Sequence, residues 1–401
     1  MKLLKKSLLS AAVASVFAVS AAQAGSVSDD KVKIGVLADM GGVYADICGP
    51  GCVTAVKMAV EDFGGTVLGK PIEVVSADDQ NKPDVGSAKV REWVESQQVD
   101  AVNGLVASSV TGAVTKVLTD AKKIALISTS ASHAFTTKAC SPYNAHWTYN
   151  VVALANGTVK PMVQAGKKKW FFITADYAFG HALEKVATGV INSNGGEVVG
   201  AVRAPLGTTD FSSYVLQAQS SGADVVALAN AGSDFVNSLK TAAEFGLTDM
   251  VDVAGLLVFT HNAKALDPAI AGGMKLTTGF YWDLDEKTRQ WSARFKARHG
   301  TIPAMGHAGA YSMTMHYLNS VKAAGTDASD AVMAKMKEMK PDDFFARNAY
   351  LRNDGRMVHD MYQVRIKKGN ERKNADDIFA VEQVIPGEEA FGKMLPQCDF
   401  K

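Results

Sequence analysis

The sequence has no excess of charge of either sign and very little cysteine. Its 401 residues carry 42 Lys and Arg against 41 Asp and Glu, which gives a formal net charge of +1. Affinity for a phosphate backbone needs clustered Lys and Arg, and here the charges are dispersed, so we expect no nucleic-acid partner. No long apolar run of the kind that spans a membrane follows the first residues of the chain.

Catalytic and cofactor motifs are also missing from the sequence. It contains no G-x-S-x-G elbow, no H-E-x-x-H pair and no Walker A loop, and its eight histidines are scattered. The glycine loop around Gly49 and Gly51 has Thr54 where a dinucleotide fingerprint needs its third glycine. We therefore expect neither an enzyme nor a cofactor or metal site, and a secreted two-domain enzyme is the weakest of the hypotheses.

The first residues have the pattern of a secretory signal peptide. A basic start with Lys2, Lys5 and Lys6 precedes a short apolar stretch, and Ala22 and Ala24 form an A-x-A cleavage pattern. We expect cleavage after Ala24 and a periplasmic location.

Four cysteines remain in the expected mature chain, Cys48, Cys52, Cys140 and Cys398. An even count in an oxidising compartment indicates disulfides, and three pairings are possible. We favour Cys48–Cys52 together with Cys140–Cys398. A zinc site is disfavoured because no histidine or carboxylate stands at a recognisable spacing from the first pair.

Alternating apolar runs and helical patterns predict an α/β fold. Strands are expected at Val32–Leu37 and Pro71–Ala77, and a helix at 84–97 with Asp84 as its N-cap. The strands are continuous apolar runs, which is typical of parallel sheets covered by helices on both faces. A polar break at 130–150 separates two such units, and Asp354-Gly355 predicts a late hairpin. The length also favours two domains.

Polar residues follow several of the predicted strands, at the end of the sheet where open α/β folds bind ligands. Ser108 and Ser109 follow one strand and Ser130–Ser132 the next, and a helix start with hydroxyls suits a carboxylate. In the second unit, Asp176–Gly180 and Asn230–Asp234 could cover an apolar group and hold an ammonium. Each of these residues could equally be an ordinary helix cap.

The chain resembles the type I periplasmic solute-binding proteins of ABC transporters for branched-chain amino acids. The resemblance covers nearly the whole expected mature chain, and it rests on the order and spacing of several segments: VKIGVLADMGGVYAD, LGKPIEVVSADDQNKPDVG, LISTSAS, CSPYNAHWTYN, FFITADYAFG and RNDGRMVHDMYQVRIKKG. It implies two lobes that close on a small ligand about a hinge and a complex that docks on membrane permeases. A sensor of the same fold is the alternative, and we expect a monomer.

The resemblance also implies the residues that bind the ligand. The carboxylate would meet the loop of Ala107, Ser108 and Ser109 and the loop of Ala131 and Ser132. In the second lobe the ring of Phe179 would cover the ligand, where the family often has Tyr, and Asp234 would pair with an ammonium, where the family often has the longer Glu. The remaining candidates are Tyr44, Asn230 and Tyr281, with Phe280 as an alternative to Tyr281.

The family pattern also sets the expected lobe boundaries. A first lobe of 31–148 plus 279–345 would join a second lobe of 149–278 plus 346–385, followed by a tail of 386–401. The ligand is expected to be a hydrophobic amino acid or an aromatic or aliphatic carboxylate.

Overall fold

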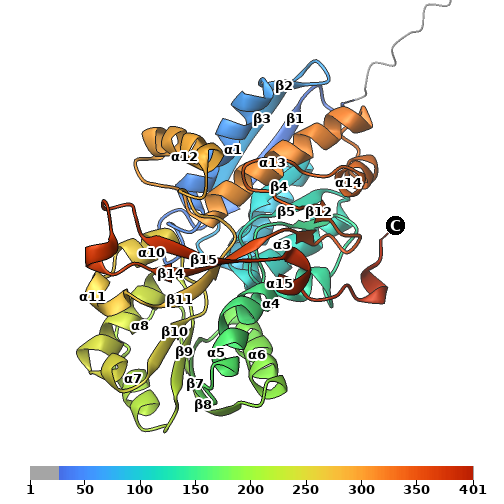
Figure 1. Cartoon of the computed structure of the whole chain (residues 1–401). Helices are drawn as coiled ribbons and strands as arrows, with labels where there is room; N and C mark the ends of the chain where they lie inside the picture. Colours follow the sequence, from blue (N-terminus) through green and yellow to red (C-terminus); the bar gives the residue numbers. More distant parts are fainter. Residues whose placement is uncertain (1–26, 401) are drawn as a thin grey trace, which may run out of the picture.

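The computed structural model describes residues 27–400. It shows two lobes, and each lobe has its own central sheet with helices on both faces (Figure 1). The expected signal peptide lies outside the described residues. The α/β fold predicted from the sequence is confirmed. Within the described part of the chain, no helix has the length and hydropathy of a membrane span.

The first lobe is built on a six-stranded sheet. All of its strands run parallel except β2, which is antiparallel to β3. In spatial order the strands are β2 (Thr66–Val67), β3 (Lys70–Asp78), β1 (Val32–Ala38), β4 (Ala101–Gly104), β5 (Ile124–Ile127) and β6 (Asn144–His146). Its helices are α1 (Gly49–Phe63), α2 (Pro83–Ser96), α3 (Ser108–Asp120), η1 (His133–Thr136), α12 (Glu286–His299), α13 (Met305–Ala324) and α14 (Ser329–Glu338).

The second lobe contains a four-stranded parallel sheet with the order β10-β9-β7-β8. These strands are β7 (Lys169–Ala175), β8 (Glu197–Ala204), β9 (Val225–Ala229) and β10 (Asp252–Gly255). The helices are α4 (Val151–Leu154), the π-helical turn η2 (Ala155–Val159), α5 (Lys160–Gln164), α6 (Ala178–Ser193), α7 (Ser212–Gln219), α8 (Gly232–Glu244), α9 (Leu247–Met250), α10 (Thr260–Lys264) and α11 (Pro268–Ala271).

Two small antiparallel sheets complete the molecule. The first joins β11 (Lys275–Thr278), β14 (Met361–Ile366) and β15 (Phe379–Ile385), and the second is the hairpin of β12 (Tyr350–Leu351) and β13 (Met357–Val358). The short helices η3 (Gly369–Glu371), α15 (Gly387–Ala390) and η4 (Pro396–Cys398) lie between and after these strands. The hairpin turns at Asp354-Gly355, as the sequence predicts.

Three segments cross between the lobes side by side. The His359 ring nitrogen Nε2 lies 2.8 Å from the Thr148 carbonyl oxygen, and a Cβ on Gly279 would stand 3.1 Å from that same oxygen. These crossings lie near residues 148, 279 and 359, and the lobe boundaries expected from the sequence remain predictions.

A buried arginine lies next to the β12–β13 hairpin. The guanidinium of Arg356 is fully buried and donates to the carbonyl oxygens of Trp147 and Tyr149, and the Gly355 carbonyl accepts from His146 N at 2.7 Å. A buried guanidinium needs such acceptors because it cannot lose its charge. These contacts hold the β12–β13 hairpin against β6 of the first lobe.

The start of α2 differs from the sequence-based prediction. Pro83 occupies the first turn, and Lys82 is the extended N-cap residue, without a side-chain cap. Proline fits this position because its fixed φ suits the helix and its missing N–H has no partner there. Asp84 is therefore not the N-cap. It lies inside the first turn, where its negative charge interacts favourably with the positive end of the helix dipole.

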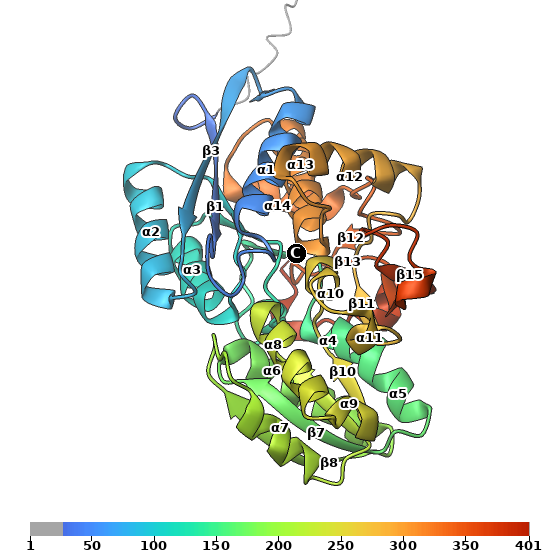
Figure 2. The ribbon, with the colours of Figure 1, turned by 90° about the vertical axis from the view of Figure 1, so that its left-hand side faces the viewer.

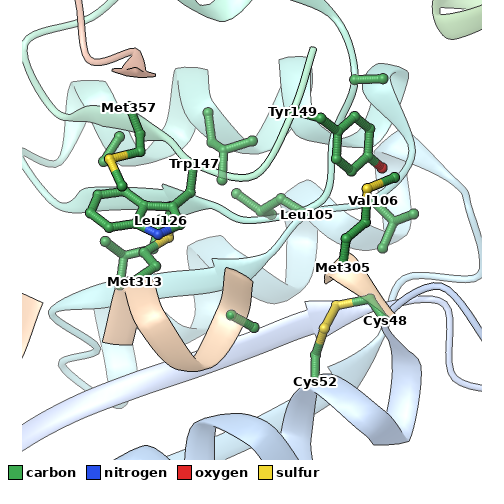
Figure 3. Packing of buried hydrophobic residues seen from close by; sticks show 14 of the residues in the cluster. Cys48, Cys52, Leu105, Val106, Leu126, Trp147, Tyr149, Met305, Met313 and Met357 are labelled. Carbon is green, nitrogen blue, oxygen red and sulfur yellow. A yellow bond between two sulfur atoms is a disulfide. The ribbon is translucent and has the colours of Figure 1, made fainter. Parts of the chain in front are cut away.

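The core of the first lobe continues beneath the cleft between the lobes. Figure 3 shows the Cys48–Cys52 disulfide beside Met305, with Tyr149 and Val106 nearby. All of these side chains are buried. The structure also joins Cys140 to Cys398, so both pairs are those favoured from the sequence.

Candidate functional site

A small pocket lies where the two lobes meet, past the carboxyl ends of strands from both large sheets. The free space inside is about 10 Å³, on the order of one water molecule, so the lobes are closed on each other. Figure 2 shows the ribbon of the two lobes one above the other. The walls are mostly aromatic and aliphatic, and none of the described residues that line it is a carboxylate, histidine or cysteine. The lining residues are Tyr44, Ile47, Val106, Thr129, Ala131, Tyr149, Tyr177, Phe179, Ala231 and Leu257.

The loop after β1 presents Tyr44 to the pocket. The buried Asp39 carboxylate accepts from the backbone N–H of Gly42 at 2.6 Å and of Tyr44 at 2.9 Å, and from Asn81 Nδ2 at 2.5 Å. One carboxylate therefore satisfies several donors of a turn that would otherwise be unpaired. The loop leads into α1, which carries Pro50 in its first turn, where proline fits because its missing N–H has no partner there.

The start of α3 gives the first lobe its polar wall. Its N-cap residue Ala107 has no side chain that can bond the first-turn N–H groups. The Ser108 hydroxyl lies 3.1 Å from the Ser130 hydroxyl, and both side chains are buried. Val106 lines the pocket just before this turn. Free N–H groups and hydroxyls at a helix start favour an anion such as a carboxylate.

The loops after β5 and β6 form the adjoining wall. The buried Tyr149 hydroxyl donates to the Thr129 carbonyl, and Ala131 lines the pocket. Ser132 is the N-cap residue of η1, because its hydroxyl accepts from Ala134 N at 3.3 Å. Its hydroxyl is thus engaged in the local cap.

The second lobe closes the pocket with aromatic rings. The Tyr177 hydroxyl donates to the Tyr44 hydroxyl at 2.7 Å, which makes a hydrogen bond between the lobes. The Tyr177 ring centroid is 5.9 Å from that of Phe179. Burial, above all, raises the pKa of Tyr44 and of Tyr177, and both phenols are protonated at neutral pH.

A buried carboxylate stands behind these rings. Asp234, in the first turn of α8, accepts from Gly207 N at 3.1 Å through Oδ2, whereas its buried Oδ1 has no hydrogen-bond partner. Burial raises the pKa of Asp234 to about 6, and its charge in turn raises the pKa of Tyr44 and Tyr177. Asp234 does not line the pocket as it stands. Its side chain thus combines proximity to the rings with an unused acceptor.

The remaining predicted residues lie away from the pocket. The Tyr281 hydroxyl accepts from the backbone N–H of Ile378 and Phe379 and so belongs to the core of the second lobe. Phe280 packs against Trp291 in the first lobe. Asn230 Nδ2 donates to Ser238 Oγ at 3.0 Å beneath α8. Ser109 is half-buried on α3 and is not among the lining residues.

The structure thus brings Tyr44, Ala131 and Phe179 to the pocket and places Ala107, Ser108 and Asp234 beside it. Tyr177 and Ala231 lie in the segments Asp176–Gly180 and Asn230–Asp234 that the sequence analysis named, but neither was singled out. Sequence reasoning missed Tyr149, which lies in the polar break at 130–150. The other lining residues that it missed are Ile47, Val106, Thr129 and Leu257.

Two α/β lobes joined by three crossings, with a pocket at the strand ends, define the class of two-lobe ligand-binding proteins. The match to a family model is extensive: residues 31–371 match the periplasmic binding protein family. The chain belongs to this family.

Solved structures support the assignment. A periplasmic binding protein from Burkholderia mallei is 46% identical, with a TM-score of 0.90, and the match covers 92% of this chain and 98% of that one. A branched-chain amino acid ABC transporter periplasmic ligand-binding protein from Burkholderia xenovorans is 38% identical, with a TM-score of 0.81, over 90% of this chain and 97% of that one.

Curated relatives match over a shorter stretch. A Leu/Ile/Val-binding protein homolog from Brucella melitensis is 28% identical over 246 residues, which is 61% of each chain. The match therefore spans about three fifths of the length of these relatives.

Proposed function

We propose that this chain is the periplasmic substrate-binding component of an ABC importer. It captures a small amino acid or a related carboxylate between its lobes and delivers it to membrane permease subunits. One observation carries the proposal: the uncapped start of α3 with Ser108 faces, across one pocket, the Tyr177 and Phe179 rings with Asp234 behind them. A polar wall, an apolar cover and a nearby carboxylate suit a ligand with a carboxylate and a compact apolar group.

Relatives narrow the ligand class. The Burkholderia xenovorans protein is a periplasmic ligand-binding protein of a branched-chain amino acid ABC transporter. A more distant protein of the same fold from Rhodopseudomonas palustris, 22% identical, holds 4-hydroxybenzoate. Branched-chain amino acids and 4-hydroxybenzoate share a carboxylate and differ in the ammonium. We therefore take the carboxylate as the common element and Asp234 as the residue that separates the alternatives.

Ligand capture requires the lobes to open and close about the three crossings. In the closed form the Tyr44–Tyr177 hydrogen bond and the Val43 carbonyl, which accepts from Ser233 N at 3.4 Å, join the lobes directly. A ligand adds contacts to both walls and so shifts the population towards closure. The carboxylate would lie against α3 and the apolar group between the rings of Tyr149 and Phe179.

The remaining assignments belong to the same proposal. Export follows from the signal peptide pattern, with cleavage after Ala24, and the protein acts as a monomer without enzymatic activity. The closed form is the one that the permease would recognise, because only this form presents both lobes in a fixed relation.

Thermal unfolding of the purified mature protein with a panel of ligands tests the proposal. The panel contains leucine, isoleucine, valine, benzoate and 4-hydroxybenzoate at 1 mM, with acetamide as a control that lacks a carboxylate. A ligand present at about 1,000 times its Kd should raise the midpoint temperature of unfolding by roughly 5–10 °C. Isothermal titration then gives the affinity. No shift with any small carboxylate would overturn the proposal.

A further inference from the structure

Three carboxylates converge at the end of the first lobe that faces away from the pocket. Asp29 precedes β1, Asp100 precedes β4, and Asp327 lies in the loop between α13 and α14 (Figure 1). One oxygen of each lies within 4.8 Å of the other two. The pocket follows the carboxyl ends of these strands, so this cluster is at the opposite edge of the sheet.

The spacing of these oxygens fits one coordination sphere. Calcium binds oxygen ligands at about 2.4 Å, so two of its ligands are never more than about 4.8 Å apart. Asp100 and Asp327 are buried, and Asp29 is half-buried. Like charges at this distance repel unless a cation lies between them.

The cluster has more negative charge than its protein partners neutralise. Lys123 Nζ lies 2.8 Å from Asp100 Oδ1 and is the one ammonium bonded to the cluster within residues 27–400. The ammonium of Lys33 binds the Gln97 carbonyl instead. Three carboxylates against one lysine leave two negative charges, which is the charge that a divalent cation balances.

Two buried polar atoms at the cluster lack hydrogen bonds. Asp29 Oδ2 has no partner, and neither has the hydroxyl of Tyr317, whose side chain is fully buried on α13. Thr314, one turn earlier on the same helix, accepts from Asn103 of β4 at 3.0 Å, and the charges of Asp100 and Asp327 act on the Tyr317 hydroxyl. Buried polar groups are nearly always satisfied by protein, water or an ion.

The other contacts order the cluster without filling it. Asp327 Oδ2 accepts from Ser28 N at 2.8 Å and from Ser28 Oγ at 2.7 Å. Asp100 Oδ2 accepts from Lys33 N at 2.9 Å. These bonds join the segments before β1 and after α13, and those at the starts of β1 and β4.

We infer that Asp29, Asp100 and Asp327 bind a divalent cation of the calcium type, with the Tyr317 hydroxyl beside it. All the donor atoms are oxygens, which hard cations prefer, whereas zinc and copper favour nitrogen and sulfur. Calcium tolerates irregular geometry better than magnesium does. The ion joins the segment before β1 to β4 and to the α13–α14 loop, so it stabilises the first lobe without touching the pocket.

Thermal unfolding with and without calcium tests the site. The mature protein is treated with EDTA, exchanged into metal-free buffer and then unfolded with 10 mM CaCl2 or with NaCl at the same ionic strength. Extracellular calcium sites often have millimolar or tighter affinity, so the midpoint should rise by about 2–8 °C with calcium alone. Terbium luminescence, excited through nearby tyrosine, gives a direct binding curve.

Matched variants decide whether the effect belongs to this cluster. Asp29→Asn and Asp327→Asn should weaken terbium binding by about 10- to 100-fold and abolish the calcium shift. Asp30→Asn is the control, because Asp30 is exposed and pairs with Lys70 outside the cluster. If one variant fails to fold, the calcium-dependent unfolding and the terbium binding of the wild-type protein still test the inference. No shift and no luminescence in the wild type, or an equal shift in all variants, would overturn the inference.

Discussion

The two lobes share one pocket but are built differently around it. The first lobe contributes the uncapped start of α3 and the Ser108 hydroxyl to the site. One disulfide lies within this lobe, and the other joins the C-terminal tail to it. The second lobe offers aromatic rings and a buried carboxylate, and it contains no cysteine. The difference indicates a cross-linked first lobe that receives the ligand and a second lobe that covers it.

The largest expected effect concerns the cross-links. Replacing Cys140 and Cys398 together by Ser should lower the free energy of unfolding by about 5 kcal/mol, because the bond closes a loop of 258 residues. The matched pair Cys48 and Cys52 closes a loop of 4 residues and should cost about 2 kcal/mol. Denaturant unfolding of the oxidised proteins measures both values.

Ligand binding should reverse this order. Cys48 follows Tyr44 and Ile47 of the pocket, whereas neither Cys140 nor Cys398 lines it. Replacing the first pair should therefore weaken the affinity more than replacing the second. If loss of the Cys140–Cys398 bond weakened binding as strongly, the division between cross-linking and ligand contact would be wrong.

The second prediction concerns closure. Gly232 has a φ of +62°, and a Cβ there would meet the Val43 carbonyl and stand 2.9 Å from the Tyr44 ring. Gly232→Ala should keep the lobes apart and weaken ligand binding by about 100-fold, or about 2.7 kcal/mol. Titration calorimetry measures this loss.

Gly246 supplies the control for that variant. Its φ is +71°, and nothing lies within 4 Å of an added Cβ, so Gly246→Ala carries the same backbone strain without an effect at the lobe interface. Equal loss of affinity in the two variants would mean that strain, and not closure, sets the binding energy.

The third prediction separates the two ligand classes by pH. The pKa of Asp234 in the closed protein is about 6, above its ordinary value of about 3.9. Its ionised form is therefore the costly one, and that cost is absent below pH 4 and complete above pH 6. A ligand ammonium would favour the ionised form, so amino acid affinity should fall by about tenfold between pH 7 and pH 5.

Asp234→Asn should remove this pH dependence and weaken amino acid binding, yet leave benzoate-type ligands unaffected or better bound. Asp176→Asn is the control, because Asp176 is an exposed carboxylate in the same lobe that pairs with His181 at 2.8 Å. Strong leucine binding by Asp234→Asn at every pH would show that no ammonium meets Asp234.

The sequence predicted the strands well and the side-chain directions poorly. Apolar runs located β1 and β3, and the rule that ligands meet strand ends led to Ser108, which lies beside the pocket, and to Phe179, which lines it. The DYAFG segment holds two aromatic residues, and its pattern alone does not show that Tyr177 points to Tyr44. Tyr281 was wrongly placed because its hydroxyl meets backbone N–H groups near β15, almost a hundred residues later in the chain.

Contacts between distant segments are a part of the fold that the sequence does not reveal. The β12–β13 hairpin packs against β6 because Arg356 finds its acceptors at Trp147 and Tyr149. The acidic cluster of Asp29, Asp100 and Asp327 joins segments up to 298 residues apart. Neither contact has a local pattern, since the partners are chosen by burial and charge in the folded chain.

The smallest expected effect concerns the polar wall of the first lobe. Ser108→Ala removes a buried hydroxyl that lies 3.1 Å from Ser130, and the α3 N–H groups remain in place. The loss should be about fivefold in affinity for any carboxylate ligand, the value of one neutral hydrogen bond. Ser109→Ala is the control, because the half-buried side chain of Ser109 is not among the pocket's lining residues and its loss should leave affinity unchanged.

Since the carboxylate is common to both ligand classes, Ser108→Ala should weaken leucine and benzoate alike, whereas Asp234→Asn should weaken one class only. If Ser108→Ala weakened one ligand class more than the other, the first lobe would also contribute to ligand specificity. The division between a common carboxylate site in the first lobe and a selective second lobe would then be wrong.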